Sequence, residues 1–380
     1  MSTLIEQKNK ASTHRLGDLA EIRRGSSPRP IHEYITKTGM PWVKIADVTN
    51  INSRFVNSTK EFIRESGVKN SVIVNPGDLI LSNSATPGIP KILGITACVH
   101  DGWLLLKPNE ELLDKSYLYY KLLYIRPSLL NAANGAVFDN LKTDILKEFR
   151  IEIPDIKTQK QIAEVLSAYD EKIELNNKIL TELEELSEIL YQEWFIKFQF
   201  PGHASIKFIE TEEQKVPVGW ENKKLGEVVD LAYGKALKAE DRKIGLYPVV
   251  GSSGVVGSHC EFLVKGPGIV VGRKGNAGSL IWIDQDFYPI DTTFYVVTEL
   301  DLHFCFLMLK NQTFQSGDSA VPGLNREAAY KNDVLVPPFN IQKTFGSVVA
   351  PMFEKMREIR EENEELAKMR ELLTIELMAK

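Results

Sequence analysis

Four loop segments of the sequence gather amide, hydroxyl and cationic side chains, which are groups that can bind nucleic acid. The segments are residues 44–50, 82–86, 251–257 and 272–277. Asn suits the edge of adenine, Arg and Lys suit guanine, and hydroxyl and backbone N–H groups position phosphates. The candidate DNA-binding residues are Lys44, Thr49, Asn50, Asn83, Ser84, Thr86, Ser252, Ser253, Arg273, Lys274 and Asn276. Ordinary polar loops have the same composition, so a purely structural role stays open for each segment.

Motifs that would give the chain a chemistry of its own are missing from the sequence. It contains no Walker A loop, no HExxH helix and no GxSxG elbow, and residues 251–257 lack the spacing of a dinucleotide-binding loop. Pro337-Pro338-Phe339 resembles part of an amino-methyltransferase signature, but Val336 stands where that signature needs Asp or Asn. The six histidines and three cysteines have no metal-ligand spacing. We therefore expect no catalytic residue, no metal and no cofactor in this chain.

Composition and charge fit a globular protein of two or three domains. The chain has 380 residues, a hydrophobic fraction of 43% and a net charge of −5. Its acidity is concentrated between Asp170 and Glu193, where eight acidic residues oppose two lysines, whereas residues 14–157 carry 19 basic and 16 acidic residues. The net charge therefore neither demonstrates nor excludes DNA binding. Isolated cysteines, with no secretory signal and no long apolar run, predict a cytoplasmic protein without a membrane span.

The elements that must position the loops are arranged twice along the chain. Leu16-Gly17-Asp18 opens one strand-rich stretch and Leu225-Gly226-Glu227 opens another, and each leads through a proline into a long charged helix. This duplication predicts an α+β fold with a pseudo-two-fold internal repeat: two similar mixed α/β domains separated by a long antiparallel pair of helices. The expected parts are a flexible lead-in at 1–13, a first domain at 14–157, a central helix at 158–200, a linker at 201–215, a second domain at 216–339 and a distal helix at 340–380.

Both predicted helices carry a heptad seam of apolar residues. The seams span residues 162–194 and 345–377. In an antiparallel pair without stagger, Asn176 faces Asn363, and the two buried amides can bond each other and fix the register. A parallel pair would instead bury each amide against aliphatic side chains, so we predict the antiparallel arrangement. In that arrangement Arg370 can bond the Tyr169 hydroxyl.

The first helix also has a second apolar stripe. It consists of Leu175, Ile179, Leu186 and Ile189. A single partner helix cannot cover two faces of one helix. The stripe therefore either contacts the adjoining domains or docks helices of another protein.

Short motifs at corresponding places point to one family. Besides the two leucine-glycine-acid openings, they are Val216-Pro217-Val218-Gly219-Trp220 and the junction of Ile153-Pro154 with residues 159–166, echoed by Pro337-Pro338 with Gln342-Lys343. Over nearly its whole length, the chain resembles the specificity (S) subunit of type I restriction-modification systems. It departs from that pattern where the first copy lacks the Pro-Gly-Trp lead-in and where Phe345-Gly346 replaces the Ile-Ala that the family favours.

The resemblance implies two target-recognition domains, each reading one half of a split site in double-stranded DNA. The helices would act as a spacer and as the platform for two modification (M) subunits, with the stripe of Leu175, Ile179, Leu186 and Ile189 as the M-subunit interface. The M subunits would bind S-adenosylmethionine and methylate adenine, and restriction (R) subunits can join for cleavage. Two alternatives stay open: a self-contained DNA adenine methyltransferase and a coiled-coil adaptor that does not bind DNA.

Overall fold

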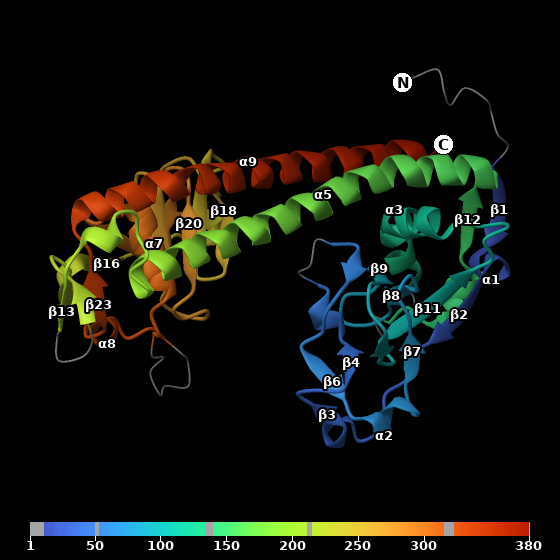
Figure 1. Ribbon diagram of the computed structural model, residues 1–380. Helices are drawn as coiled ribbons and strands as arrows, with labels where there is room; N and C mark the ends of the chain where they lie inside the picture. Colours follow the sequence, from blue (N-terminus) through green and yellow to red (C-terminus); the bar gives the residue numbers. More distant parts are fainter. Residues whose placement is uncertain (1–10, 50–52, 134–139, 211–214, 315–322, 380) are drawn as a thin grey trace. The chain divides into compact units, whose positions relative to one another are not determined.

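The computed structural model describes residues 11–49, 53–133, 140–210, 215–314 and 323–379, and the candidate Asn50 lies outside them. These residues form a mixed helix and strand fold of two compact units (Figure 1). The first unit contains Met1–Asn177 and Glu362–Lys380, and the second contains Lys178–Glu361. The predicted α+β class is confirmed. The units differ from the six expected parts because each one includes a domain together with one half of each long helix.

The first unit contains two five-stranded sheets and a two-stranded one among its described residues. One sheet has the order β2-β11-β8-β9-β5, the other has the order β3-β6-β4-β10-β7, and β1 pairs with β12. The strands are β1 (Ser12–Arg15), β2 (Ala20–Arg24), β3 (Ile35–Thr36), β4 (Met40–Val43), β5 (Phe55–Val56), β6 (Glu61–Ile63), β7 (Val72–Val74), β8 (Leu79–Ser82), β9 (Pro90–Leu93), β10 (Ala97–Val99), β11 (Trp103–Pro108) and β12 (Arg150–Ile153). The helices are α1 (Leu16–Leu19), α2 (Glu65–Val68), α3 (Lys115–Ala133), α4 (Thr143–Glu148) and the parts of α5 (Ile156–Tyr191) and α9 (Phe339–Met378) that belong to this unit.

The second unit has the same plan with fewer strands. Its main sheet has the order β16-β22-β19-β20, and β18-β17-β21 form a second sheet. The strands are β13 (Phe208–Glu210), β14 (Lys215–Pro217), β15 (Glu221–Lys224), β16 (Val229–Tyr233), β17 (Tyr247–Gly251), β18 (Gly254–His259), β19 (Gly268–Gly272), β20 (Leu280–Ile283), β21 (Tyr288–Pro289), β22 (Thr293–Thr298) and β23 (Asp333–Val336). The helices are α6 (Leu225–Val228), α7 (Leu302–Lys310), α8 (Arg326–Tyr330) and the remaining parts of α5 and α9, and a π-helical turn at Gln192–Ile196 ends α5.

The central strand of each main sheet is buried on both faces. In β8, Leu79 and Leu81 belong to the core that includes α3, whereas Ile80 belongs to the core on the opposite face. In β19, Val271 and Val270 divide in the same way between two cores. Successive side chains of a strand point to opposite faces, so a continuous apolar run is what such a central strand needs.

The glycine of each leucine-glycine-acid opening allows close packing against a short helix near the end of the same domain. A Cβ atom added to Gly17 would lie 3.0 Å from Cβ of Lys147 in α4. One added to Gly226 would lie 2.8 Å from Cβ of Tyr330 in α8. The acid that follows has different partners in the two units. The Glu227 carboxylate accepts a hydrogen bond of 2.7 Å from the backbone N–H three residues earlier and so caps its turn, whereas Asp18 accepts hydrogen bonds from the Arg15 guanidinium. The glycine of the motif is therefore the packing device that is repeated in both units.

A buried glutamine secures the start of each long helix. Gln159 is 0% exposed and Gln342 is 2% exposed. The Nε2 atom of each donates to the carbonyl of the proline five residues earlier, at 2.9 Å in the first unit and 2.8 Å in the second. Their Oε1 atoms accept from the backbone N–H groups of Asp114 and Asp301, whose side chains cap α3 and α7. This shared network confirms the predicted internal repeat.

The halves of α5 and α9 in the first unit run antiparallel. Asn176 Nδ2 donates to Asn363 Oδ1 at 2.8 Å and to Glu362 at 2.8 Å. Asn363 Nδ2 in turn donates to Asn177 Oδ1 at 3.0 Å. Asn176 is 1% exposed, so the predicted amide contact is present and buried. Its role in fixing the register stays a prediction.

One expectation about this seam is wrong. Arg370 was expected to bond the Tyr169 hydroxyl, but its Nη1 atom donates to the carboxylate of Asp170. Asp170 is 3% exposed and also accepts a hydrogen bond of 2.5 Å from the hydroxyl of Tyr120 in α3. A guanidinium binds a carboxylate more strongly than it binds a neutral phenol. This ion pair joins α5, α9 and the domain within the first unit.

In the second unit, aromatic side chains hold the two long helices. The rings of Trp194 and Phe345 lie 5.4 Å apart, and those of Phe195 and Phe345 lie 4.8 Å apart. Arg360 donates to Glu184 at 3.1 Å. From the Glu184–Arg360 contact to the Trp194–Phe345 contact, the residue number increases in the first helix and decreases in the second. The two helices are therefore antiparallel here as well.

Candidate nucleic-acid interface

The same loop follows the central strand of both main sheets. It comprises residues 83–88 after β8 and residues 273–278 after β19. In each loop, the N–H of the closing glycine donates to the carbonyl of the last strand residue at 2.8 Å. The third residue has a positive φ in both cases, 56° at Ala85 and 79° at Gly275. The two loops therefore share one backbone conformation.

The first residue of each loop is fixed on both sides by backbone hydrogen bonds. The N–H of Asn83 donates at 2.8 Å to the turn before β11, and the N–H of Arg273 donates at 2.9 Å to the turn before β22. Their carbonyls accept from the N–H groups of Leu141 and Leu324, both at 2.9 Å. The backbone is thus constant, whereas the side chains change from Asn-Ser-Ala-Thr to Arg-Lys-Gly-Asn. A constant frame with different side chains can present two different binding surfaces.

In the first unit, the loop side chains divide into supporting and exposed ones. Asn83 is only 4% exposed, and its Nδ2 atom donates to the Asp101 carbonyl at 3.1 Å. Ser84 and Thr86 are partly exposed. The position of Asn83 therefore favours support of the loop, and Ser84 and Thr86 are the groups that can reach a ligand.

The other candidates of the first unit are bound to their own surroundings. Lys44 forms an ion pair with Glu61, and the Thr49 hydroxyl donates to the Ile45 carbonyl at 2.8 Å. Within the described residues, no hydrogen bond or ion pair joins Lys44 or Thr49 to residues 83–88.

In the second unit, the candidate serines of the turn at residues 252–253 lie beside the loop that carries the candidates Arg273, Lys274 and Asn276. Ser252 and Ser253 form the turn between β17 and β18, and the Ser279 hydroxyl at the far side of the second loop donates to the Ser252 carbonyl at 2.8 Å. A Cβ atom on Gly275 would lie 3.3 Å from the Ser252 hydroxyl oxygen. Lys274 and Asn276 are exposed. The serine turn and the loop of residues 273–278 therefore form one polar and cationic surface.

Tyr233 and Arg326, which were not among the sequence candidates, complete this surface. The guanidinium carbon of Arg326 lies 5.0 Å from the ring centre of Tyr233, and that of Arg273 lies 4.9 Å from the same ring centre. Arg273 Nη1 also donates to the Asp291 carbonyl at 3.0 Å. No spacing motif joins residues this far apart in the sequence, so Tyr233 and Arg326 carried no signal before the fold was known.

A corresponding corner of the first unit gathers arginines around a carboxylate. Arg24 Nε donates to the Asp101 carbonyl at 2.7 Å, and Arg29 pairs with the Asp101 carboxylate at 3.1 Å. Burial acts to raise the pKa of Asp101, but the hydrogen bond from Ser27 and the two arginines outweigh it, so the pKa lies below its ordinary value. Asp101 is therefore ionised and holds both arginines.

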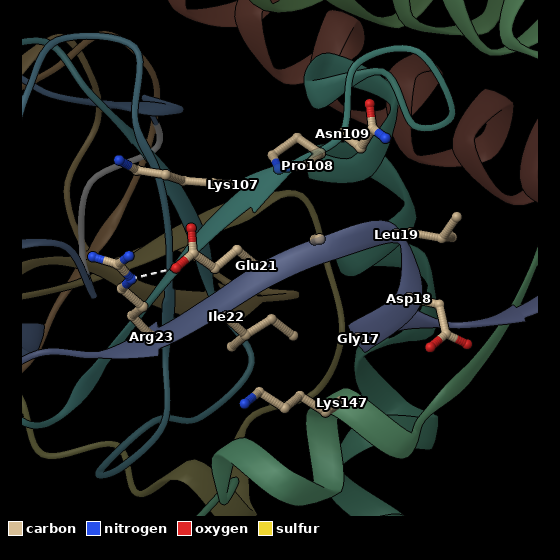
Figure 2. A pocket seen from close by; sticks show the side chains of 11 residues that line it. Gly17, Asp18, Leu19, Glu21, Ile22, Arg23, Lys107, Pro108, Asn109 and Lys147 are labelled. Atoms are coloured by element: carbon tan, nitrogen blue, oxygen red, sulfur yellow. Dashed lines mark hydrogen bonds and ion pairs between the residues drawn. The ribbon is translucent and has the colours of Figure 1, made fainter.

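A shallow groove lies elsewhere on the first unit, beside the opening motif (Figure 2). It is lined by Gly17, Asp18, Leu19, Ala20, Glu21, Ile22, Arg23, Lys107, Pro108, Asn109 and Lys147. Figure 2 shows that the charged side chains of Asp18, Lys107 and Lys147 point in different directions, and Glu21 pairs with Arg23. Its polar groups do not converge on one point, as a catalytic centre requires.

The described part of the chain has neither a cluster of metal-ligating side chains nor a helix suited to a membrane. No group of three or more His, Cys, Asp or Glu side chains is placed to hold a metal ion there. None of the described helices is long and apolar enough to cross a membrane.

Comparison with known proteins decides the family. The model of the type I restriction modification DNA specificity domain matches residues 9–185 and again residues 217–368. The chain belongs to this specificity family. The first matched segment contains the loop of residues 83–88 and the second contains the loop of residues 273–278. The structural repeat therefore coincides with the family's repeated domain.

Relatives in this family are similar along most of the chain. The MjaIX specificity subunit of Methanocaldococcus jannaschii is 25% identical over 96% of this chain and 91% of its own length. The MjaVIII specificity subunit of the same organism is 27% identical over 59% of this chain and 50% of its length. The crystal structure of the type I S subunit from M. genitalium shares the specificity fold, with a TM-score of 0.58 at 18% identity, covering 98% of this chain and 97% of that one.

Proposed function

We propose that this type I specificity subunit reads a bipartite site in double-stranded DNA, with one half-site for each unit. The observation that carries the proposal is the pair of equivalent loops, which keep one backbone frame and present different side chains. In the first unit the proposed contacts are Ser84 and Thr86, with Lys44, Thr49 and Asn50 as further candidates. In the second unit they are Arg273, Lys274 and Asn276 with Ser252 and Ser253.

In the proposed assembly this chain is a non-catalytic, cytoplasmic subunit. Modification subunits bind S-adenosylmethionine and methylate adenine, and restriction subunits can join them. The naming of the relatives as specificity subunits supports this division of labour. A self-contained methyltransferase is the less favoured alternative, and binding of S-adenosylmethionine by the pure chain would support it.

The long helices support docking of two modification subunits, because exposed apolar residues recur in equivalent positions. Gln159 and Gln342 align the helices at a spacing of 183 residues. At that spacing, Val165 corresponds to Val348, Leu186 to Met369 and Ile189 to Leu372. The members of each pair have similar exposures, namely 43% and 41%, 43% and 51%, and 55% and 67%.

Each unit carries three of these residues. The first-unit set is Val165, Met369 and Leu372, and the second-unit set is Val348, Leu186 and Ile189. Two equivalent sets of exposed apolar residues fit two copies of one partner. Leu175 and Ile179 are the other two residues of the predicted interface. At the same spacing of 183 residues they correspond to Glu358 and Glu362, so these two apolar positions have no apolar equivalent in the second long helix.

Paired substitutions test the docking proposal. We expect Leu186→Glu with Ile189→Glu to remove one modification subunit from the purified complex, and Met369→Glu with Leu372→Glu to remove the other. Native mass spectrometry would count the subunits, and Ile73→Glu, which changes an apolar residue 47% exposed on β7, is the matched control. Retention of two modification subunits by both paired variants would contradict the proposal.

Mapping of methylated sites tests recognition itself. A host that carries this chain with its modification subunit is expected to methylate adenines in a split motif of two constant parts with a spacer of constant length. An uninterrupted motif, or methylation that does not depend on this chain, would contradict a bipartite recognition function.

A further inference from the structure

A cluster of two arginines and one aromatic ring lies on the surface of the second unit. Tyr233 ends strand β16 and is 50% exposed. The guanidinium carbons of Arg273 and Arg326 lie 4.9 Å and 5.0 Å from its ring centre. Arg273 is also 5.9 Å from the ring of Phe294, and Arg326 is 5.6 Å from that of Tyr330. These are the distances of cation–π contacts.

Both arginines are hydrogen-bonded to backbone carbonyls of the unit. Arg273 Nη1 donates to the Asp291 carbonyl at 3.0 Å, and Arg326 Nη1 donates to the Leu231 carbonyl at 3.5 Å. A guanidinium that is in cation–π contact and hydrogen-bonded has already lost much of its rotational freedom, so ordering it on binding costs little.

The cluster has an excess of positive charge. Arg326 lies 3.6 Å from the Glu327 carboxylate, whereas Arg273 and the neighbouring Lys274 form no ion pair with the described residues. Two guanidinium groups beside one ring repel each other, and the single Glu327 carboxylate offsets only part of the positive charge of Arg273, Lys274 and Arg326. The favoured ligand is therefore an anion with oxygen acceptors, which guanidinium groups bind in a fixed planar geometry.

We propose that Arg273 and Arg326 bind phosphates of the DNA backbone and that Tyr233 positions both. This inference rests on the proposed recognition function and deepens it. Both guanidinium groups are held beside Tyr233 and backbone carbonyls of the unit. Base edges lie in a major groove about 8.5 Å deep, so groups held in this way are suited to phosphates and not to base edges. Base contacts then belong to Lys274 and Asn276, which are exposed in the adjoining loop.

Substitutions of Arg326 and Tyr233 test this division. Binding of the complex with modification subunits to DNA would be measured across a series of salt concentrations and on a library with the second half-site randomised. Arg326→Ala is expected to weaken binding roughly tenfold for all sequences, and to reduce the slope of log K against log salt by about 0.9. Tyr233→Leu is expected to have a similar effect, whereas Tyr233→Phe keeps the ring and stays near wild type.

The controls separate charge, folding and recognition. Arg357→Ala removes a paired arginine of α9 in the same unit and is expected to leave binding unchanged. Retained modification-subunit binding and an unchanged melting temperature would show that each variant is folded. Lys274→Ala is expected to relax one base position instead of weakening all sequences evenly.

The outcomes distinguish the cluster from the recognition function. If the wild-type complex prefers a split motif but Arg326→Ala and Tyr233→Leu bind normally, the phosphate cluster is wrong and the recognition function stands. A change of base preference in Arg326→Ala would also overturn the phosphate assignment. If the wild-type complex has no split motif, the recognition function fails, whereas an even loss of affinity in the variants would still support a backbone contact.

Discussion

Asp170→Asn is expected to weaken the attachment of the long helices to the first domain. Asp170 is 3% exposed, and its carboxylate binds Arg370 of α9 and the hydroxyl of Tyr120 in α3. Removing one partner of a buried ion pair costs about 3–5 kcal/mol because the other charge stays buried. The Arg370 side chain is 24% exposed, so water can reach it, and the neutral amide still accepts from Tyr120. We therefore expect a cost below that range, about 2–3 kcal/mol.

Hydrogen exchange of the full-length chain measures this cost locally. Peptides from α3 and the first half of α5 would report the free energy of opening of the first unit, without assuming that the whole chain unfolds in one step. Asp170→Asn combined with Arg370→Met removes both charges and is expected to recover at least half of the loss.

The matched control is an exposed ion pair in the same unit. Lys172 and Glu362 are 3.4 Å apart with side chains 45% and 44% exposed, so Lys172→Gln is expected to cost less than about 0.5 kcal/mol. Equal losses in Asp170→Asn and Lys172→Gln would refute the account of Asp170 as the buried link, as would an unchanged opening free energy in Asp170→Asn.

Three further predictions concern pH, packing and thiol access. Burial lowers the pKa of Lys91 to about 8, so between pH 8 and 10 the unfolded chain holds more protons than the folded one. The opening free energy of the first unit should therefore rise by about 1–2 kcal/mol over this pH range, relative to the Lys91→Met variant. If hydrogen exchange shows the same difference in opening free energy between wild type and Lys91→Met at both pH values, this prediction is contradicted. Gly226→Ala should lower the stability by about 1–3 kcal/mol because the added Cβ would lie 2.8 Å from Tyr330. Gly323→Ala, whose added Cβ would have its nearest neighbour at 3.5 Å, should change the melting temperature little. Equal shifts in melting temperature for the two variants would contradict the packing role of Gly226. Of the three thiols, only that of Cys260 is exposed, so a thiol reagent should modify one cysteine rapidly in the folded chain and three after unfolding; rapid native modification of Cys98 or Cys305 would contradict their burial.

Local sequence patterns were sufficient to predict the repeat and the helix pair. The heptad steps placed Asn176 opposite Asn363 because a seam fixes which positions of two helices can meet, and the structure has this contact. The same reasoning failed for Arg370, since a one-dimensional seam omits side chains beside it such as Asp170. The structure has α5 at Ile156–Tyr191 and α9 at Phe339–Met378, where the sequence predicted helices at 158–200 and 340–380.

The candidate interface was less predictable because it is assembled across the fold. The serine turn and the loop of residues 273–278 meet only because β17 and β19 place their ends together, and Tyr233 joins Arg273 to Arg326 from a third strand. Composition alone could not distinguish an exposed amide such as Asn276 from Asn83, which the fold buries. The equivalence of the two loops lies in their backbone hydrogen bonds, which differing side chains conceal in the sequence.

The most direct test of independent recognition randomises one half-site at a time. The complex would be assembled with wild-type chain, with Ser84→Ala and Thr86→Ala together, or with Lys274→Ala and Asn276→Ala together, and methylation of each library would be sequenced. We expect the first pair to relax preference only in the half-site of the first unit, and the second pair only in the other half-site. Loss of preference in both halves from changes in one unit, or no effect from either pair, would contradict the central claim that each unit reads its own half.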